Sequence, residues 1–575
     1  MDTRGTLRGM IGAGALAAVA MAAPAGAEVA PVYLNQGWSA ATRNAFYIGD
    51  QGSQIMPLSW IEALKQPNGA PFLADSLGRY GYLANPDKDA RGLPVGFTAA
   101  GAKGKEQFGM TCSACHTRQI EVGGLQYRTD GGPGIVDFQP FLADLDTAVN
   151  TVLTDDAAFK DFAKAVLGGN PSVGAQAKLH QDVAAWFLRY DTLVKQALPP
   201  APWGPSRLDA VSMIFDRLTG LDIGPPPSYL IPANIIVASA PVRYPFLWNA
   251  PIQDFTQWPG FAANGDALLA LARNLGEVYG VFADFHPVKG LFGVNYLKIN
   301  SANFKGLGDQ EDRIRKLGPP KWQWPLDQTL VAAGKAIFDR PNEQGGCTGC
   351  HGITDGPVRP IFQKTWNTPI LDVGTDTREY QILGTTVQTG VLEGAGIPPL
   401  PATDKAFSVL ETSVVWSILQ HFNPFKAKTT DTAKVLGAKA LASPKGAELQ
   451  TAFVPPSTAT SSATPSANAS PPANAYESRV LQGIWAAAPY LHNGSVRSLA
   501  DLLKPAAERA VSFKIGPAYD LENVGLAAEQ TKFNYVLTTT GCDELNSGDS
   551  RCGHEYGTTL SAQDKRALLE YLKSL

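Results

Sequence analysis

The sequence has 575 residues, of which 44% are hydrophobic and 17% charged, and its formal net charge is −4. This composition is typical of a globular protein with a large core, and the length alone predicts roughly two to four domains. The charge is too small for a chain of this length to indicate nucleic acid or an anionic membrane as the main partner.

Residues 1–27 predict a signal peptide. Arg4 and Arg8 precede a short stretch of Ala, Gly and Met that ends in the tripeptide AGA at 25–27. A basic head, a short apolar middle and a small-x-small end are typical of a segment that is cleaved, here before Glu28. The apolar run is shorter than the ~18 residues that span a bilayer, and no later stretch reaches that length. We therefore expect a periplasmic or secreted protein with no stable membrane span.

The sequence contains two C-x-x-C-H motifs, CSACH at 112–116 and CTGCH at 347–351. In each motif two thiols can bond the two vinyl groups of one haem, and the adjacent histidine can bind the iron from below. A redox C-x-x-C needs no adjacent histidine, and a zinc ribbon has a second C-x-x-C without one. We therefore predict two covalently bound c-type haems. The residues that attach and ligate them are Cys112, Cys115 and His116 for the first, and Cys347, Cys350 and His351 for the second.

A first haem domain is expected at about 28–325, with helical patterns around 139–168 and 180–197. The Pro-rich stretch that ends at Trp322 to Pro325 marks its boundary. A second, cytochrome c-like domain is expected at about 326–575.

The second domain should begin and end with helices. Thr329 to Phe338 places apolar side chains and Gly334 on one helical face. Near the chain end, Ser561 and Asp564 resemble a capping box that opens an amphipathic helix. A glycine lets another helix approach closely, and together these helices resemble the crossing terminal helices of cytochrome c domains. We therefore predict a mainly α fold, with two cytochrome c-like haem domains, long loops and little β structure.

Two further segments of the second domain have a distinct composition. Residues 455–475 are rich in Ser, Thr, Ala and Pro and cannot bury a core, so they predict a disordered insert. Cys542 and Cys552 lie in a short polar segment and are expected to form a disulfide in an oxidising compartment. Closing this loop should stabilise the fold by about 2.8 kcal/mol in the chain-entropy model.

The sixth ligand decides what each haem does. No Met follows His351, so the second iron should have a histidine in place of the usual Met and a lower potential. Of the three later histidines, His421 lies in an apolar helical stretch and is better interpreted as a core or surface residue than as a ligand. His554, in a loop next to glycine and the disulfide, is favoured over His492.

For the first haem no good sixth ligand is found. His180 and His286 are better interpreted as structural residues, and Met56 and Met110 as core residues. An open face on this haem follows, where oxygen or peroxide could bind.

Several segments resemble a known family. The spacing of the two haem motifs and one downstream segment resemble the dihaem cytochrome c peroxidase superfamily, and further segments resemble its branch of rubber oxygenase and bacterial dihaem fatty-acid dioxygenases. The segments are YIGDQGSQIMPLSWIEAL (47–64), LPVGF (93–97), YPFLWNAP (244–251), APYLHNGSV (488–496) and GHEYGT (553–558).

The resemblance implies roles for individual residues. It implies His116 as the proximal ligand of a haem that binds dioxygen, and His351 with His554 as the axial ligands of a second haem that stores electrons. Trp248 matches a tryptophan that lies between the haems in this superfamily, which implies a catalytic role.

Three functions are compatible with these features. The favoured one is an oxygenase that uses O2 to oxygenate or cleave an apolar unsaturated substrate. The alternatives are a peroxidase that reduces H2O2 with electrons from an external donor protein, and a pure electron carrier. The lack of Met ligands counts against the carrier and against the usual electron-entry haem of the peroxidases.

Overall fold

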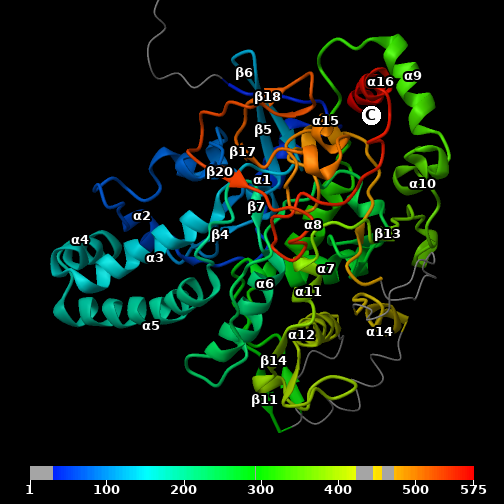
Figure 1. Ribbon diagram of the computed structural model, residues 1–575. Coiled ribbons are helices and arrows are strands. Elements are labelled where there is room, and N and C mark those ends of the chain that lie inside the picture. The colour runs from blue at the N-terminus through cyan, green and yellow to red at the C-terminus, as the bar shows by residue number, and fades with distance from the viewer. Residues whose placement is uncertain (1–29, 292, 423–443, 456–471) are drawn as a thin grey trace, which may run out of the picture.

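The computed structural model describes residues 30–291, 293–422, 444–455 and 472–575 (Figure 1). In this described part, no helix is both long enough and apolar enough to cross a membrane.

Two sequence predictions fall on other residues. The signal peptide at 1–27 and residues 456–471 of the insert at 455–475 lie outside the described residues.

The fold contains more β structure than the sequence analysis predicted. It is 39% helical and 15% strand, and its small sheets are scattered among the helices (Figure 1). The prediction of a mainly α fold built from two all-helical cytochrome domains is therefore wrong. The sequence did not predict these strands because they are only two to six residues long. An alternating pattern of that length cannot be distinguished from loop sequence.

The α-helices of the described residues alternate with loops and short strands. They are α1 (Ala40–Tyr47), α2 (Leu58–Ala63), α3 (Phe138–Thr154), α4 (Asp156–Leu167), α5 (Val173–Ala197), α6 (Ala210–Phe215), α7 (Ala267–Gly280), α8 (Phe304–Ile314), α9 (Gln328–Phe338), α10 (Thr348–His351), α11 (Arg378–Ile382), α12 (Ala406–His421), α14 (Pro444–Leu449), α15 (Leu499–Leu502) and α16 (Ala562–Ser574).

Two sheets have three strands and the others have two. In the first, β6 (Leu125–Asp130) lies between β1 (Val32–Tyr33), which is parallel to it, and the antiparallel β5 (Thr117–Val122). In the second, β4 (Gln107–Met110) lies between β2 (Met56–Pro57) and β3 (Phe97–Ala100).

The remaining strands form antiparallel pairs. These are β7 (Arg207–Leu208) with β8 (Val242–Arg243), β9 (Phe255–Thr256) with β10 (Ala262–Ala263), β11 (Val288–Gly290) with β12 (Gly293–Asn295), β13 (Ile370–Leu371) with β16 (Tyr476–Glu477), β14 (Thr386–Gln388) with β15 (Thr403–Lys405), β17 (Ser512–Lys514) with β20 (Val536–Thr538), and β18 (Tyr519–Asp520) with β19 (Gly525–Leu526).

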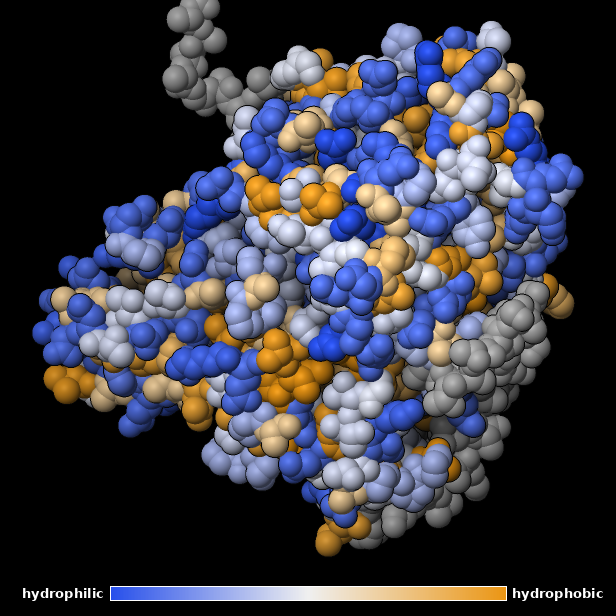
Figure 2. Space-filling view, in the orientation of Figure 1, coloured by the Kyte–Doolittle hydropathy of each residue, from blue (hydrophilic) through white to orange (hydrophobic). Residues whose placement is uncertain are grey.

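The predicted helices of the N-terminal half are confirmed. The pattern at 139–168 corresponds to α3 and α4, which are separate helices because Asp155 caps α4 by accepting from the backbone N–H groups of Ala157 and Ala158. The pattern at 180–197 lies within α5. Helices α3, α4 and α5 form a projecting arm (Figure 1) that is covered mainly by hydrophilic residues in the view of Figure 2.

The predicted helix pair of the C-terminal half is also confirmed. Ser561 caps α16 and accepts from the backbone N–H of Asp564 at 3.1 Å. Helix α16 lies against α9 (Figure 1), and a Cβ at Gly334 would lie 2.0 Å from the carbonyl oxygen of Ala567. Only glycine permits this approach.

The hydrophobic core crosses the position of the predicted domain boundary at 325/326. One cluster of buried side chains combines Leu34 and Ile120 with Trp485 and Leu572. A second cluster combines α7 with α12. The two parts of the chain therefore share buried surface, and the boundary remains a prediction.

Candidate haem sites

The first C-x-x-C-H motif forms a tight turn between two sheets. A 3₁₀ turn at Cys112–Ala114 follows β4, and His116 directly precedes β5. Gly96 has a φ of +82°, and a Cβ there would lie 2.0 Å from the backbone nitrogen of Ala114. The motif therefore lies directly on Gly96, where no side chain fits.

The His116 imidazole is oriented by the backbone. Its Nδ1 donates to the carbonyl oxygen of Pro245 at 2.8 Å, which leaves Nε2 free to face a metal. Burial lowers the pKa of His116 to about 4, so the ring is neutral, as a metal ligand must be. Among the described residues, the Tyr244 ring lies next to the His116 ring, with the two centroids 6.0 Å apart, and no histidine ring faces His116.

Cys112 and Cys115 are both desolvated by the protein around them. Both side chains are only partly buried by surface area, yet burial is the main cause that raises the pKa of each thiol to about 12. Two thiols and one free imidazole nitrogen within one five-residue motif fit the attachment of one haem.

The second motif is arranged in the same way. Cys347 precedes the short helix α10, which ends at His351. The His351 Nδ1 donates to the carbonyl oxygen of Arg479 at 2.8 Å, which again leaves Nε2 free. Cys347, Cys350 and His351 line a pocket together with His554.

His554 is the histidine that faces His351. Their ring centroids are 6.0 Å apart, which suits one ion between two nitrogens at bonds of about 2 Å each. The Nδ1 of His554 is buried without a hydrogen-bond partner, and burial, followed by the neighbouring His351, lowers the pKa of this ring to about 3. The residues of this pocket fit a haem with two axial histidines.

The alternative ligands lie differently. His492 borders the same pocket, but its ring stacks on Tyr476 at 3.7 Å. His421, at the end of α12, stacks on Phe304 at 3.9 Å. His286 contacts Arg189 and Asp222 instead of either motif.

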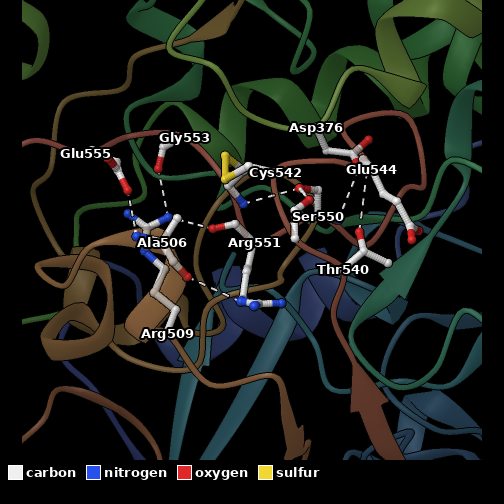
Figure 3. Close-up of a disulfide and its surroundings, with 12 residues drawn as sticks. Asp376, Ala506, Arg509, Thr540, Cys542, Glu544, Ser550, Arg551, Gly553 and Glu555 are labelled. Atoms are coloured by element: carbon white, nitrogen blue, oxygen red, sulfur yellow. Dashed lines mark hydrogen bonds between the residues drawn. A yellow bond between two sulfur atoms is a disulfide. The ribbon is translucent and has the colours of Figure 1, made fainter.

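The turn that carries His554 is fixed from two sides (Figure 3). The predicted disulfide Cys542–Cys552 is confirmed and is consistent with export. On the other side, the Arg509 guanidinium donates to the carbonyl oxygens of Arg551 at 2.6 Å and Gly553 at 2.7 Å. These contacts hold His554 in a left-handed conformation, with a φ of 51°, which is costly for a residue with a Cβ.

The remaining walls of the second pocket are mainly apolar. They come from the 481–503 segment and from α16, and they give the space beside the histidines an apolar lining. The apolar residues are Leu481, Ile484, Leu499, Leu502, Leu503, Leu568 and Leu572.

Trp248 is completely buried. Its Nε1 donates to the carbonyl oxygen of Gln482 at 2.7 Å. Its ring stacks on Phe246 with centroids 4.7 Å apart, and Phe246 borders the second pocket.

Two groups of polar residues near the motifs were missed in the sequence. Glu277 on α7 accepts from Gln257 at 2.7 Å and lies near Cys112, whose thiol pKa it raises further after burial. The Arg479 carbonyl oxygen accepts from His351, and its guanidinium donates to the carbonyl oxygen of Phe246, the residue after Pro245, which accepts from His116. No sequence pattern points to these residues, because a single polar residue in an apolar stretch belongs to no motif with a defined spacing.

The comparisons with known proteins agree with these sites. Residues 475–514 match a family model described as RoxA-like, cytochrome c-like. These residues include Arg479 and most of the apolar wall of the second pocket. This segment is therefore similar to the RoxA-like, rubber oxygenase-like cytochromes, and the similarity supports a haem cofactor and a haem-dependent oxidoreductase.

The chain belongs to the same family as a relative from Sinorhizobium fredii (strain NBRC 101917 / NGR234), "Uncharacterized protein y4iJ". The two are 30% identical over 595 aligned residues, which cover 94% of this chain and 93% of the relative. "Uncharacterized protein y4iM" of the same strain is 23% identical, over 67% of this chain and 75% of its own length.

Proposed function

We propose that this protein is an exported dihaem c-type cytochrome that uses dioxygen to oxygenate or cleave an apolar unsaturated substrate. The difference between the two sites carries the proposal. His351 faces a second imidazole, whereas His116 faces none among the described histidines. A site closed by two histidines is suited to electron storage, and a site with one is open to a small ligand.

Each residue of the sites has a task in this proposal. Bound haem would supply the redox and oxygen chemistry. The cysteines Cys112 and Cys115 would anchor the first haem, and Cys347 and Cys350 the second. The hydrogen bonds to Pro245 and Arg479 keep the Nδ1 proton in place on both ligand histidines and hold the other nitrogen ready to bind iron.

Peroxide reduction with an external electron donor protein is the second candidate, and one observation favours it. Glu277, hydrogen-bonded to Gln257, is close enough to Cys112 to affect its thiol, and burial raises the pKa of the Glu277 carboxyl. A carboxyl group with a raised pKa can deliver and accept protons, which the cleavage of peroxide requires.

Oxygen uptake distinguishes the two candidates. The purified haem-loaded protein is incubated in air with an unsaturated fatty acid or polyisoprene, and separately with H2O2 and a reduced cytochrome. The oxygenase proposal predicts oxygen consumption with oxygenated or cleaved products, and Glu277→Gln should leave this largely intact. Rapid peroxide turnover that Glu277→Gln abolishes, without oxygen uptake on any unsaturated substrate, would establish the peroxidase instead.

A further inference from the structure

Both motif histidines are oriented by carbonyl groups that one arginine connects. The Arg479 carbonyl oxygen accepts from His351 Nδ1 at 2.8 Å. The guanidinium of the same residue donates through Nη1 to the carbonyl oxygen of Phe246 at 2.7 Å. Phe246 directly follows Pro245, whose carbonyl oxygen accepts from His116 Nδ1. A continuous path of hydrogen bonds and backbone therefore joins the two imidazoles through Arg479.

The guanidinium also holds the Phe246 side chain in place. Its central carbon lies 4.0 Å from the centroid of the Phe246 ring, a cation–π contact that is strong when desolvated. The Trp248 ring also stacks on the Phe246 ring, at an interplanar angle of 12°. Arg479 thus fixes both the backbone and the ring of the segment that orients His116.

Arg479 is itself rigidly held. Its Nε and Nη2 donate to Gln253 Oε1 at 3.1 and 2.7 Å, and its guanidinium lies 3.7 Å from the Glu477 carboxylate. Arg479, Gln253 and Glu477 are all buried. Burying an arginine and a carboxylate together gives little or no net stability, so fold stability alone does not explain this arrangement.

We propose that Arg479 is a positioning residue shared by the two haem sites, which sets the orientation of both ligand histidines and couples their reduction potentials. The inference rests on the proposed function, because it takes His116 and His351 as the iron ligands. A fixed positive charge near both sites favours the reduced form of each, and hydrogen bonding to a ligand histidine tunes its basicity.

The test replaces the guanidinium and leaves the backbone carbonyl that His351 uses. In Arg479→Gln, the potentials of both haems should fall, with the reduction equilibrium of each shifted by about tenfold, the lower end of what losing an outer-shell partner costs a metal site. Arg479→Lys retains the positive charge, so its two haem potentials should lie between those of Arg479→Gln and those of the wild type. Potentials are measured by spectroelectrochemical titration of the full haem-loaded chain, and melting curves confirm folding.

Arg509→Gln is the matched control. This buried arginine contacts the turn of His554 but none of the residues that orient His116, so its loss should move the potential of the second haem only. A potential shift at one haem alone in Arg479→Gln, or at neither, overturns the inference. If Arg479→Gln fails to fold, Gln253→Leu takes its place, because it removes the acceptor of two Arg479 N–H groups. Both potentials should then shift, by less than in Arg479→Gln. Two unchanged potentials would refute the inference.

The wild-type protein separates this inference from the proposed function. A wild type without two haems, or without histidine ligation at His116 and His351, contradicts the proposed function itself. Two such haems that respond independently to Arg479 variants contradict only the coupling.

Discussion

The imidazole rings of His351 and His554 face one another across the second pocket, with their centroids 6.0 Å apart and their planes 44° from parallel. The two residues are 203 positions apart in the sequence, yet both point into the same largely apolar space.

From this relationship we predict that His554→Ala converts one low-spin haem to high-spin. Removing the imidazole leaves a gap that water can fill, and water is a weaker ligand. Electron paramagnetic resonance of the oxidised protein gives the measurement. His492→Ala is the control, since that ring stacks on Tyr476, and it should leave the low-spin signal intact. The opposite result would make His492 the ligand.

Each cysteine pair should carry one haem. Replacing Cys347 and Cys350 by Ala should lower the intact mass by one haem, because the thioether bonds are lost, and replacing Cys112 and Cys115 should have the same effect at the other site. Mass spectrometry under denaturing conditions measures both. A wild-type mass with one haem or none would refute two covalent attachments.

Arg509 should hold the turn that carries His554. Arg509→Gln leaves the part-buried carbonyl of Arg551 and the buried carbonyl of Gly553 without their donor, which should cost about 1–3 kcal/mol of unfolding free energy. Part of the second haem should also become high-spin. Arg551→Gln is a suitable control, because its guanidinium makes longer bonds, the shortest of them 3.3 Å to Ala506. Equal losses in both variants would show that the effect is not specific to this turn.

The crossing of α9 and α16 should require Gly334. Gly334→Ala places a methyl group 2.0 Å from a backbone oxygen, so the helices must move apart, at a cost of about 1–3 kcal/mol. Gly308→Ala in α8 is the matched control, since a Cβ there meets nothing within 4 Å and alanine favours helix. Chemical denaturation compares the two, and a harmless Gly334→Ala would contradict the close approach.

Acid should destabilise the fold through buried neutral histidines. Burial is the main cause that lowers the pKa of His286 to about 3, whereas in the unfolded chain it is about 6.5. Between these values the unfolded state binds a proton that the folded state does not, so stability falls as the pH falls from about 6.5 towards 3.

The variant His286→Gln isolates this effect. Glutamine can still accept from Arg189, the present partner of His286, but it does not titrate. Its unfolding free energy should depend less steeply on pH than that of the wild type, by up to about 1.4 kcal/mol per pH unit. Asp222, whose pKa burial raises to about 7, is present in both proteins and contributes to both slopes. Equal slopes between pH 4 and 6 would show that His286 is protonated in the fold.

Local sequence was informative where the chemistry is local. The haem motifs at 112–116 and 347–351, the cap at Ser561 and the glycine at 334 are recognisable because a few neighbouring residues define each of them. The disulfide of Cys542 and Cys552 follows from the same kind of reasoning, since only two cysteines remained for an oxidising compartment.

Only the tertiary structure decided the rest. The short strands exist through partners far along the chain, as β1 and β6 do, and no local pattern encodes such pairing. The same holds for Arg479, which meets Phe246 233 positions away, and for Glu277 near Cys112. A single polar side chain acquires its role from the burial and the neighbours that folding gives it, and those depend on the packing of the whole chain.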